Sequence, residues 1–484
     1  MSRRPSSLVL AIDLGSSSVR AALFTQEGTR ILPSTASRKY SIDHSAEGGA
    51  ELAAPVLLRA AKTCLAETLR WRRNSVALRQ TPIIAIAGSA FWHSLLALGR
   101  DNQPISPIFT WADSRATSDA AELRERLSER TIHRRTGCML RAPYWPAKLR
   151  WLRQTQSPLF RRAAAWVSPA SWIFRELFGV NATSHSIASG TGLYDLRATT
   201  WDADLCELCG LREDQLGVLG DSEPAFNSIQ AELHEVPVFT AIGDGAASNL
   251  GSGAESGGRI AINIGTSAAV RKILLRGETR SQVRSGLFKH VVDPERMVVG
   301  GAISNGGNLR QWCLRELKLT AGELGRALSR TAAATDTLTV LPFWVSERAP
   351  TWPEGVRGTI TGLTHTDTAA DILRAATTST FYRLAEILSE LRTSPARAEE
   401  IIVSGGVLHS PALLSILADC IGHDIRVCRE LESSLRGAAI LALQKLGFEP
   451  KPLLAGRVIR HNPSLAVKHQ SRHAQQMDLE RRLR

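Results

Sequence analysis

Two short turns that combine glycine with hydroxyl side chains lie 250 residues apart in this chain. The first, "AIDLGSSSVR", contains Gly15, Ser16 and Ser17, and the second, "AINIGTSAAV", contains Gly265 and Thr266. Each copy reads as a strand, a turn and a returning strand, which is a β-hairpin. Glycine at the tip lets backbone N–H groups approach an anion and the hydroxyls add donors, so both tips suit phosphate oxygens.

An aspartate, Asp13, ends the first strand, and Asn263 takes its place in the second copy. Mg²⁺ prefers one or two carboxylates together with water and phosphate oxygens, so Asp13 is the candidate magnesium residue. Asparagine keeps the polarity and lacks the charge, so the second tip suits phosphate alone. A single hairpin of this kind is most often an ordinary turn. The matched pair, one in each half, indicates a nucleotide-binding protein.

A third chemical candidate, Asp244, stands between Gly243 and Gly245, directly after the strand-like run "VFTAIG". Phosphoryl transfer to an alcohol needs a carboxylate that accepts the hydroxyl proton. The flanking glycines would let a substrate approach closely, and the strand would hold the carboxylate in place. A plain turn aspartate is the alternative interpretation of Gly-Asp-Gly.

Three residues of "TWADSRA", Trp111, Asp113 and Arg115, alternate along the chain. In an extended segment they would point the same way, and a ring, an acceptor and a cation on one face suit a polyol acid. The alternative is that Asp113 and Ser114 form a helix N-cap, with Arg115 solvated in the first turn.

A histidine, His93, follows the apolar run at 83–87, where α/β proteins often present ligand contacts. A buried, hydrogen-bonded histidine is the alternative. Glu347 and Arg348 precede Pro350 in a Trp-rich loop, and we expect them to form an ion pair that supports a cleft.

These residues need rigid elements to hold them, and the chain alternates β-rich runs with helical patterns, as α/β proteins do. In the first half we expect strands at 8–12, 19–24 and 83–87, and helices near 51–73, 115–130, 146–154 and 170–178. In the second half we expect strands at 260–264, 269–274, 297–299 and 401–403, and helices near 303–317, 367–392, 410–421 and 433–446. The repeat predicts two related domains with a boundary near 240–255.

Size and composition agree with two globular domains. A chain of 484 residues is too long to fold around one compact core. Its content of 43% hydrophobic and 22% charged residues is ordinary for a globular protein. We find no apolar run long enough to span a membrane and no secretory signal, so a cytoplasmic protein is expected. Seven scattered cysteines do not suggest a disulfide framework. Cys206 and Cys209 have zinc-ligand spacing, but no further ligand pair accompanies them.

Of the net charge of +13, the C-terminal segment 457–484 contributes +5, from seven Lys or Arg residues against two acidic ones. We expect this segment to be a solvated, partly ordered tail rather than a nucleic-acid-binding arm. The surplus in the rest of the chain suits anionic small molecules.

An ordered set of motifs resembles the FGGY carbohydrate kinases of the actin-like ATPase superfamily over about 8–446. The set comprises "AIDLGSSSVR", "TWADSRA", "GDGAASNLG", "NIGTSAAV", "GGNLRQW", "LPFWVSERAPTWPEGVRGTITGL" and "VSGGVLHSP". A P-loop is missing, and "GDGAAS" lacks the third glycine of a dinucleotide fingerprint. Within the family, "FWHSLLAL", "TWADSRA", "RTGCML", "YWPAKL" and "ERAPTW" are most similar to gluconate kinases and next to xylulose kinases.

The resemblance implies an α/β fold with two ribonuclease-H-like domains around a central cleft. These would be a sugar-binding domain at 1–245 and an ATP-binding domain at 246–455, followed by a basic tail at 456–484. It implies Asp244 as general base, Asp13 as Mg²⁺ residue, and His93 as a substrate contact. The implied ATP contacts are Gly15, Ser16, Ser17, Gly265, Thr266, Gly307, Gln311, Gly405 and Gly406.

The expected function is ATP-dependent phosphorylation of a sugar acid, D-gluconate to 6-phospho-D-gluconate, with Mg²⁺. Neither Arg141 nor Lys148 is assigned a role from the sequence, although either could supply a positive charge for gluconate. A xylulokinase-like ketopentose kinase and a non-catalytic actin-like ATPase scaffold are the alternatives. The expected partner is a small-molecule sugar or sugar acid, with no membrane and no nucleic acid, and a homodimer is left open.

Overall fold

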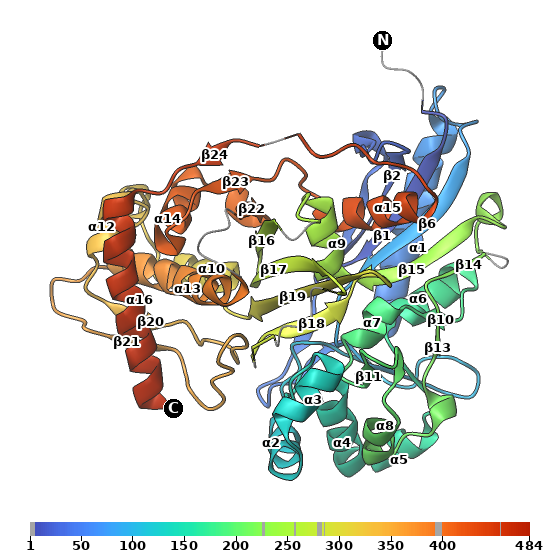
Figure 1. Cartoon of the computed structure of the whole chain (residues 1–484), viewed down its shortest axis with the longest axis horizontal. Coiled ribbons are helices and arrows are strands. Elements are labelled where there is room, and N and C mark those ends of the chain that lie inside the picture. The colour runs from blue at the N-terminus through green and yellow to red at the C-terminus, as the bar shows by residue number, and fades with distance from the viewer. Residues whose placement is uncertain are drawn as a thin grey trace.

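Two mixed β-sheets form the frame of the molecule in the computed structural model (Figure 1). The structure describes residues 5–224, 228–255, 258–277, 283–284, 286–392, 399–454 and 456–484. Both sheets contain a hairpin whose first strand pairs in parallel with a later strand of the same sheet. The α/β class and the duplicated organisation predicted from the sequence are therefore confirmed.

The first sheet has the strand order β14-β15-β6-β1-β2-β3. Strand β1 is antiparallel to β2 and parallel to β6, which is parallel to β15. Leu14 and Gly243 are both opposite Ala90, so β1, β6 and β15 end at one edge. Residues at or just after these strand ends therefore meet there. The bounds are β1 Leu8–Leu14, β2 Ser18–Thr25, β3 Ala36–Lys39, β6 Ile83–Ala90, β14 Ser222–Pro224 and β15 Pro237–Gly243.

The second sheet has the order β18-β19-β17-β16-β22-β23-β24 and repeats this arrangement. Strand β16 is antiparallel to β17 and parallel to β22, with Asn263 opposite Ser404. The second hairpin therefore presents its tip at the carboxyl edge of its own sheet. The bounds are β16 Arg259–Ile264, β17 Ala268–Leu275, β18 Phe288–Val291, β19 Arg296–Ile303, β22 Glu400–Ser404, β23 Ile425–Val427 and β24 Val458–Ile459.

Alternate residues of β1 face two different helices. Leu10 and Ile12 belong to the core that includes α1 (Ala54–Asn74), whereas Val9 and Ala11 pack with α15 (Ser433–Lys445). Both faces of β1 are buried, which is why residues 8–12 form a continuous apolar run without alternation. Helix α15 belongs to the second half of the chain, yet it covers the first sheet, so a division by sequence at 245/246 does not describe its packing.

The other predicted helices are present, with one change. The single helix expected near 115–130 is two, α2 (Thr117–Arg126) and α3 (Glu129–Thr136), because Ser128 caps α3 by accepting a hydrogen bond from the Thr131 N–H. The second sheet is covered by α13 (Ala369–Leu391) and α14 (Pro411–Ile421). Further elements are β4 Asp43–His44, β5 Ala50–Leu52, β7 Leu96–Leu98, β8 Ile108–Phe109, α4 Trp145–Thr155, α5 Ser157–Arg162, β9 Ala165–Val167, α6 Pro169–Phe178, β10 Ala182–Thr183, α7 His185–Ser189, β11 Tyr194–Asp195, β12 Thr200–Trp201, α8 Ala203–Cys209, β13 Val218–Leu219, α9 Asp244–Gly251, α10 Gly307–Glu316, α11 Ala321–Ala327, α12 Arg330–Thr335, β20 Thr339–Leu341 and β21 Thr359–Thr361.

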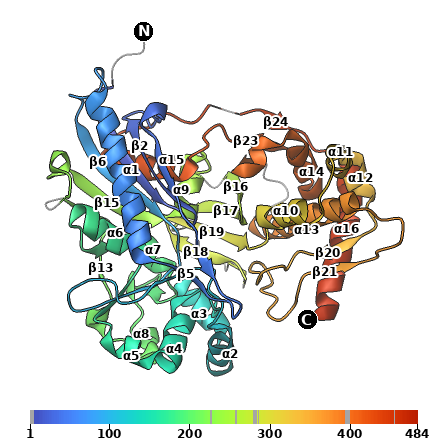
Figure 2. The same cartoon turned by 180° about the vertical axis from the view of Figure 1, so that it is seen from behind.

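The basic C-terminus is a long helix and not the solvated, partly ordered tail that was expected. Helix α16 (Pro463–Leu483) packs against α12, α14 and β20 and ends at the chain terminus (Figure 2). Its fully buried side chains, His469, Gln476 and Glu480, are polar. A hydrophobic pattern could not reveal this face. None of the described helices is long and apolar enough to cross a membrane.

Candidate functional site

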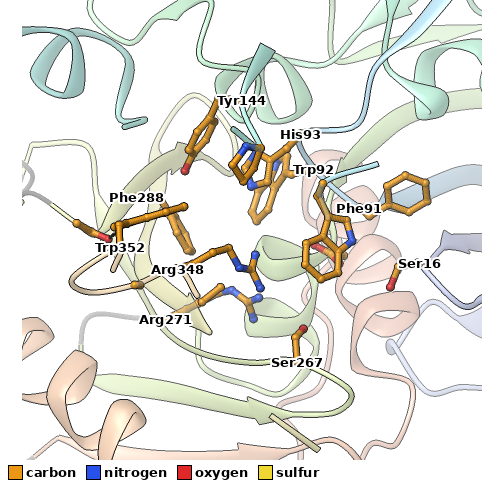
Figure 3. Close-up of a pocket in the computed structure, with 16 residues that line it drawn as sticks. Ser16, Phe91, Trp92, His93, Tyr144, Ser267, Arg271, Phe288, Arg348 and Trp352 are labelled. Atoms are coloured by element: carbon orange, nitrogen blue, oxygen red, sulfur yellow. Dashed lines mark hydrogen bonds between the residues drawn. The ribbon is translucent and has the colours of Figure 1, made fainter. Parts of the chain in front are cut away.

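A pocket of about 90 Å³ lies where the two hairpin tips and the carboxyl edge of the first sheet meet. Ser16 from the first tip and Ser267 from the second both line it (Figure 3). Asp244 lines it as well. The two turns that are 250 residues apart in sequence therefore face one space.

Asp244 enters this pocket from the junction between β15 and α9. Its Oδ1 accepts a hydrogen bond from the Gly245 N–H at 2.7 Å. A Cβ at Gly243 would lie 1.7 Å from the Trp92 ring, and one at Gly245 would lie 2.6 Å from Arg271 Nε. The two glycines thus admit a tryptophan and an arginine, whereas the sequence suggested that they admit substrate. Burial raises the pKa of Asp244, and the charge of Arg271 opposes the rise.

Asp13 is 3% exposed at the end of β1. Its Oδ1 has no hydrogen-bond partner among the described residues, and its Oδ2 is 3.6 Å from Arg20 Nη1. Burial raises the pKa of Asp13 to about 7 against the opposing charge of Arg20.

An unpartnered buried carboxylate oxygen beside a phosphate-binding tip fits Mg²⁺, which takes one or two carboxylates and completes its shell with water and phosphate. Within the described ranges, groups of three or more His, Cys, Asp and Glu residues suited to a metal are absent. Asp13 is thus the residue of the predicted set that suits this ion.

Two of the predicted nucleotide residues, Gly307 and Gly405, pack against the second hairpin. The Gly307 N–H, which begins α10, donates to Gly265 O at 3.0 Å, and a Cβ at Gly307 would lie 2.5 Å from that oxygen. Gly405 has a φ of +92°, and its Cβ would lie 2.5 Å from Ile264 O. Glycine is therefore required at both positions for these segments to approach the hairpin.

Other candidates of this set are more open. Thr266 and Gln311 are exposed, and Gln311 lies one turn after Gly307 on α10. A Cβ at Gly406 would meet no atom closer than 3.8 Å. These three residues are not tightly packed against other parts of the protein and are accessible to a ligand.

His93 follows β6 with a φ of +66°, an uncommon conformation for a residue with a side chain. Burial lowers its pKa well below the usual range, so the ring is neutral. A carbonyl can only accept, so Nδ1–H donates to Gly190 O and Nε2 is left as an acceptor. The ring packs against Tyr144 with the centroids 4.8 Å apart. His93 lines the pocket and presents a hydrogen-bond acceptor suited to a hydroxyl.

The prediction that Trp111, Asp113 and Arg115 share one face is wrong. Residues 111–115 form turns and not an extended strand, and of the three only Trp111 lines the pocket. Asp113 is buried and its Oδ1 accepts from Arg115 Nε at 3.1 Å. The Arg115 guanidinium also pairs with Glu51 at 2.6 Å and lies 4.4 Å from the Trp151 ring. The helix-cap alternative fails too, because Ala116 occupies the N-cap of α2.

Lys148 is one of the two cations to which the sequence assigned no role. Its side chain is buried. Its Nζ donates to Thr110 O at 2.6 Å and to His93 O at 3.1 Å. Burial lowers its pKa to about 7. Lys148 thus joins the backbones of two pocket segments. The other cation, Arg141, pairs with Glu129 at 3.1 Å and Glu354 at 3.1 Å.

Two arginines that the sequence reasoning did not place in the site dominate the pocket. The side chains of Arg271 and Arg348 extend next to each other toward its centre (Figure 3). The Arg348 guanidinium lies 4.6 Å from the Trp111 ring and donates to Ser304 Oγ at 3.0 Å. Arg271 Nε is buried and has no hydrogen-bond partner within the described part of the chain.

The expected ion pair between Glu347 and Arg348 is also wrong. The Glu347 carboxylate accepts from the backbone N–H groups of Ser304 and Arg348, the latter at 2.8 Å, which leaves the guanidinium to the pocket. A signal for Arg271 existed in the sequence. It lies on β17, which begins directly after Ser267, so the Gly-hydroxyl turn found in the sequence already indicated its neighbourhood.

Comparisons with known proteins match both halves of the chain. Residues 8–251 match the N-terminal domain and residues 260–446 the C-terminal domain of the FGGY family of carbohydrate kinases. The chain is 28% identical over 490 residues to a gluconokinase of Bacillus subtilis (strain 168), covering 94% of this chain and 92% of the relative. It is 27% identical to a glycerol kinase of Polaromonas naphthalenivorans (strain CJ2), covering 90% of each.

Solved structures agree with this match. A gluconate kinase from Lactobacillus acidophilus superposes with a TM-score of 0.86 at 25% identity, covering 99% of this chain and 98% of the other. A xylulose kinase from the same organism superposes with a TM-score of 0.87 at 24% identity and the same coverage.

Proposed function

The chain belongs to the FGGY family of carbohydrate kinases and uses ATP to phosphorylate a carbohydrate, and from this premise we propose that the acceptor is a sugar acid. The substrate we propose is D-gluconate and the product 6-phospho-D-gluconate. Two of the relatives above carry gluconokinase or gluconate kinase in their names, at 28% and 25% identity.

One observation carries this proposal, the pair of guanidinium groups in the pocket. Arg271 and Arg348 line it against a single aspartate, Asp244. Removing these two guanidinium groups from water costs free energy, and a neutral polyol has no opposite charge that would compensate this cost. A carboxylate would pair with a guanidinium and satisfy the unpartnered Arg271 Nε. The neutral His93 and the Trp111 ring then suit the hydroxyls and C–H edges of the same molecule.

The proposed chemistry is a direct transfer. Asp244 accepts the proton of the acceptor hydroxyl while the oxygen forms a bond to the γ-phosphorus of ATP and the bond from that phosphorus to the β-γ bridging oxygen breaks. The raised pKa of Asp244 brings the carboxylate closer to the pKa range useful for a base near neutral pH. Mg²⁺ held by Asp13 would supply positive charge to the phosphate oxygens.

The ATP contacts are also proposed. Ser16 and Ser17 on the first tip would reach the phosphates from one side, and Gly265 and Thr266 from the other. The purine and ribose would lie along a surface formed by Gly307, Gln311, Gly405 and Gly406. Asp113 and Arg115, which pair with each other away from the pocket, would act on the substrate only through the position of Trp111.

The test is a coupled assay of ADP release with gluconate, xylulose, ribulose and glycerol. We expect gluconate to give the highest kcat/KM. Replacing Arg271 by Met removes a charge-assisted bond to the carboxylate and should raise KM for gluconate by about 10- to 100-fold. Arg38 is exposed, pairs with Glu67 and does not line the pocket, so it gives the control Arg38→Met.

Two results would contradict the proposal. A preference for a neutral ketopentose, unaffected by Arg271→Met, would assign the enzyme to a xylulose-kinase-like activity. A rate of ATP hydrolysis that is the same with and without each of the four acceptors would favour the scaffold alternative.

A further inference from the structure

We infer that the C-terminal helix α16 is a positioning element of the acceptor pocket, acting through Glu480 on the loop that carries Arg348 and Trp352. The inference rests on the proposed function in one respect, namely that this pocket binds the acceptor. Helix α16 lies beyond residue 446, where the family match ends.

The connection is a chain of contacts centred on Thr351. The Thr351 hydroxyl donates to one carboxylate oxygen of Glu480, and Arg383 Nη1 donates to the other at 2.8 Å. Arg383 Nη2 donates in turn to Thr351 Oγ1 at 2.9 Å and to Ala349 O at 3.0 Å. Arg484 Nη2, at the end of the chain, reaches Thr351 O at 3.1 Å.

These contacts are shielded from water. Arg383 is 1% exposed and Glu480 is 3% exposed, and Glu386 lies 3.0 Å from Arg383 Nη1 as a second acidic neighbour. A buried pair of this kind is costly to break, because removal of one partner leaves the other unpaired in a low dielectric. The geometry of Thr351 is therefore strongly determined by α16 and α13 together.

The opposite side of the same loop forms the pocket wall. Arg348, Ala349 and Trp352 all line the pocket, and Trp352 Nε1 donates to Gly286 O at 2.9 Å. Trp352 has a φ of +48°, a conformation that persists only where the surroundings impose it. Ala349 is held both by Arg383 and by its own N–H, which donates to Ala302 O at 3.1 Å.

Loss of the Glu480 carboxylate would therefore release the outer side of a loop whose inner side contacts the acceptor. The nucleotide residues around the second hairpin make no such contact with α16 among the described interactions. The expected consequence is a change in acceptor affinity with little change in ATP affinity. The residue of the basic C-terminal segment that would act on the pocket is therefore an acidic one, Glu480.

The test compares Glu480→Gln with Thr351→Val and with the control Asp478→Asn. Asp478 lies on the same helix, is 39% exposed at its side chain, and pairs with Arg481 and Arg482. Thr351→Val removes only the hydroxyl link, so it tests the same connection if Glu480→Gln does not fold. Two readouts are used: KM for the acceptor and for ATP, and hydrogen exchange of residues 343–356 in the substrate-free protein.

We expect both variants to raise KM for the acceptor about 5- to 20-fold, to leave KM for ATP unchanged, and to accelerate exchange in 343–356, while Asp478→Asn does neither. Unchanged acceptor KM and exchange would overturn the inference, as would an equal rise of both KM values, which a general loss of stability produces. The exchange readout needs no substrate. Failure of this inference is thereby separated from failure of the gluconate proposal.

Discussion

The two hairpins have the same backbone arrangement, but they differ in the polar side chain at the end of the first strand. In the first, Asp13 brings a buried carboxylate with an oxygen that lacks a partner among the described residues. In the second, the Asn263 Nδ2 donates to Ser404 Oγ at 2.9 Å, and no charge is present at that position.

Their glycines differ as well. A Cβ at Gly15 would lie 3.1 Å from Ser18 O, within the hairpin itself, whereas a Cβ at Gly265 would meet nothing closer than 3.9 Å. The small residue at the first tip is needed for the turn, and the one at the second tip leaves space open. On the proposed assignments, the carboxylates for the reaction lie on the first sheet, whereas the second tip would contact phosphate without a charge of its own.

The largest expected effect is that of Asp244→Asn. If the carboxylates of the first sheet perform the charge chemistry, loss of the proton acceptor should lower kcat by about 1,000-fold while the Kd for ATP changes little. Single-turnover kinetics and calorimetric titration with ATP measure the two quantities. A kcat within a few fold of the wild type would remove Asp244 from the mechanism.

An exchange of the two hairpin residues tests the comparison directly. Asp13→Asn should lower kcat/KM by about 100-fold, roughly 3 kcal/mol, because a carboxylate is lost beside the phosphates. Asn263→Asp should instead weaken ATP binding by placing a negative charge next to them. The double variant would recover activity only if the hairpins were interchangeable, and we expect it to be as inactive as Asp13→Asn.

The glycines of the tips give a smaller effect. Gly265→Ala should leave the free energy of unfolding within about 0.5 kcal/mol of the wild type, because its Cβ has space, yet weaken ATP binding about tenfold by occupying that space. Gly15→Ala should cost about 1 kcal/mol of stability through contact with Ser18 O. Urea denaturation with ATP titration compares them, and equal effects on both quantities would contradict the assignment.

Buried lysines provide the smallest effect. Lys272 on the second sheet pairs with Glu399, whereas Lys148 in the first half is held by carbonyls. The pKa of Lys148 is about 7 in the folded protein and near 10.5 when unfolded, so above pH 7 the unfolded chain binds more protons and stability rises with pH. From pH 7 to 8 the wild type should gain about 1 kcal/mol relative to Lys148→Met. A constant difference in urea denaturation between pH 7 and 10 would contradict this.

The local sequence determined the framework of the site. Strands 8–12 and 83–87 lie inside β1 and β6, because short apolar runs and Gly-hydroxyl turns are encoded by neighbouring residues. The same local signals identified Asp13, His93 and Asp244 as residues at or just after strand ends, and parallel pairing then brings such ends together at one edge.

Only the tertiary structure determines the hydrogen-bond and ion-pair partners of the charged side chains. Asp113 pairs with Arg115 and Glu347 binds backbone N–H groups, while Arg271 and Arg348 enter the pocket from two separate segments of the second half. Helix α15 returns to the first sheet, and α16 reaches the pocket loop through a buried glutamate. A side-chain interaction acts over a few ångströms in space and leaves no periodic trace along the chain, so folding had to bring these groups together before their roles could be assigned.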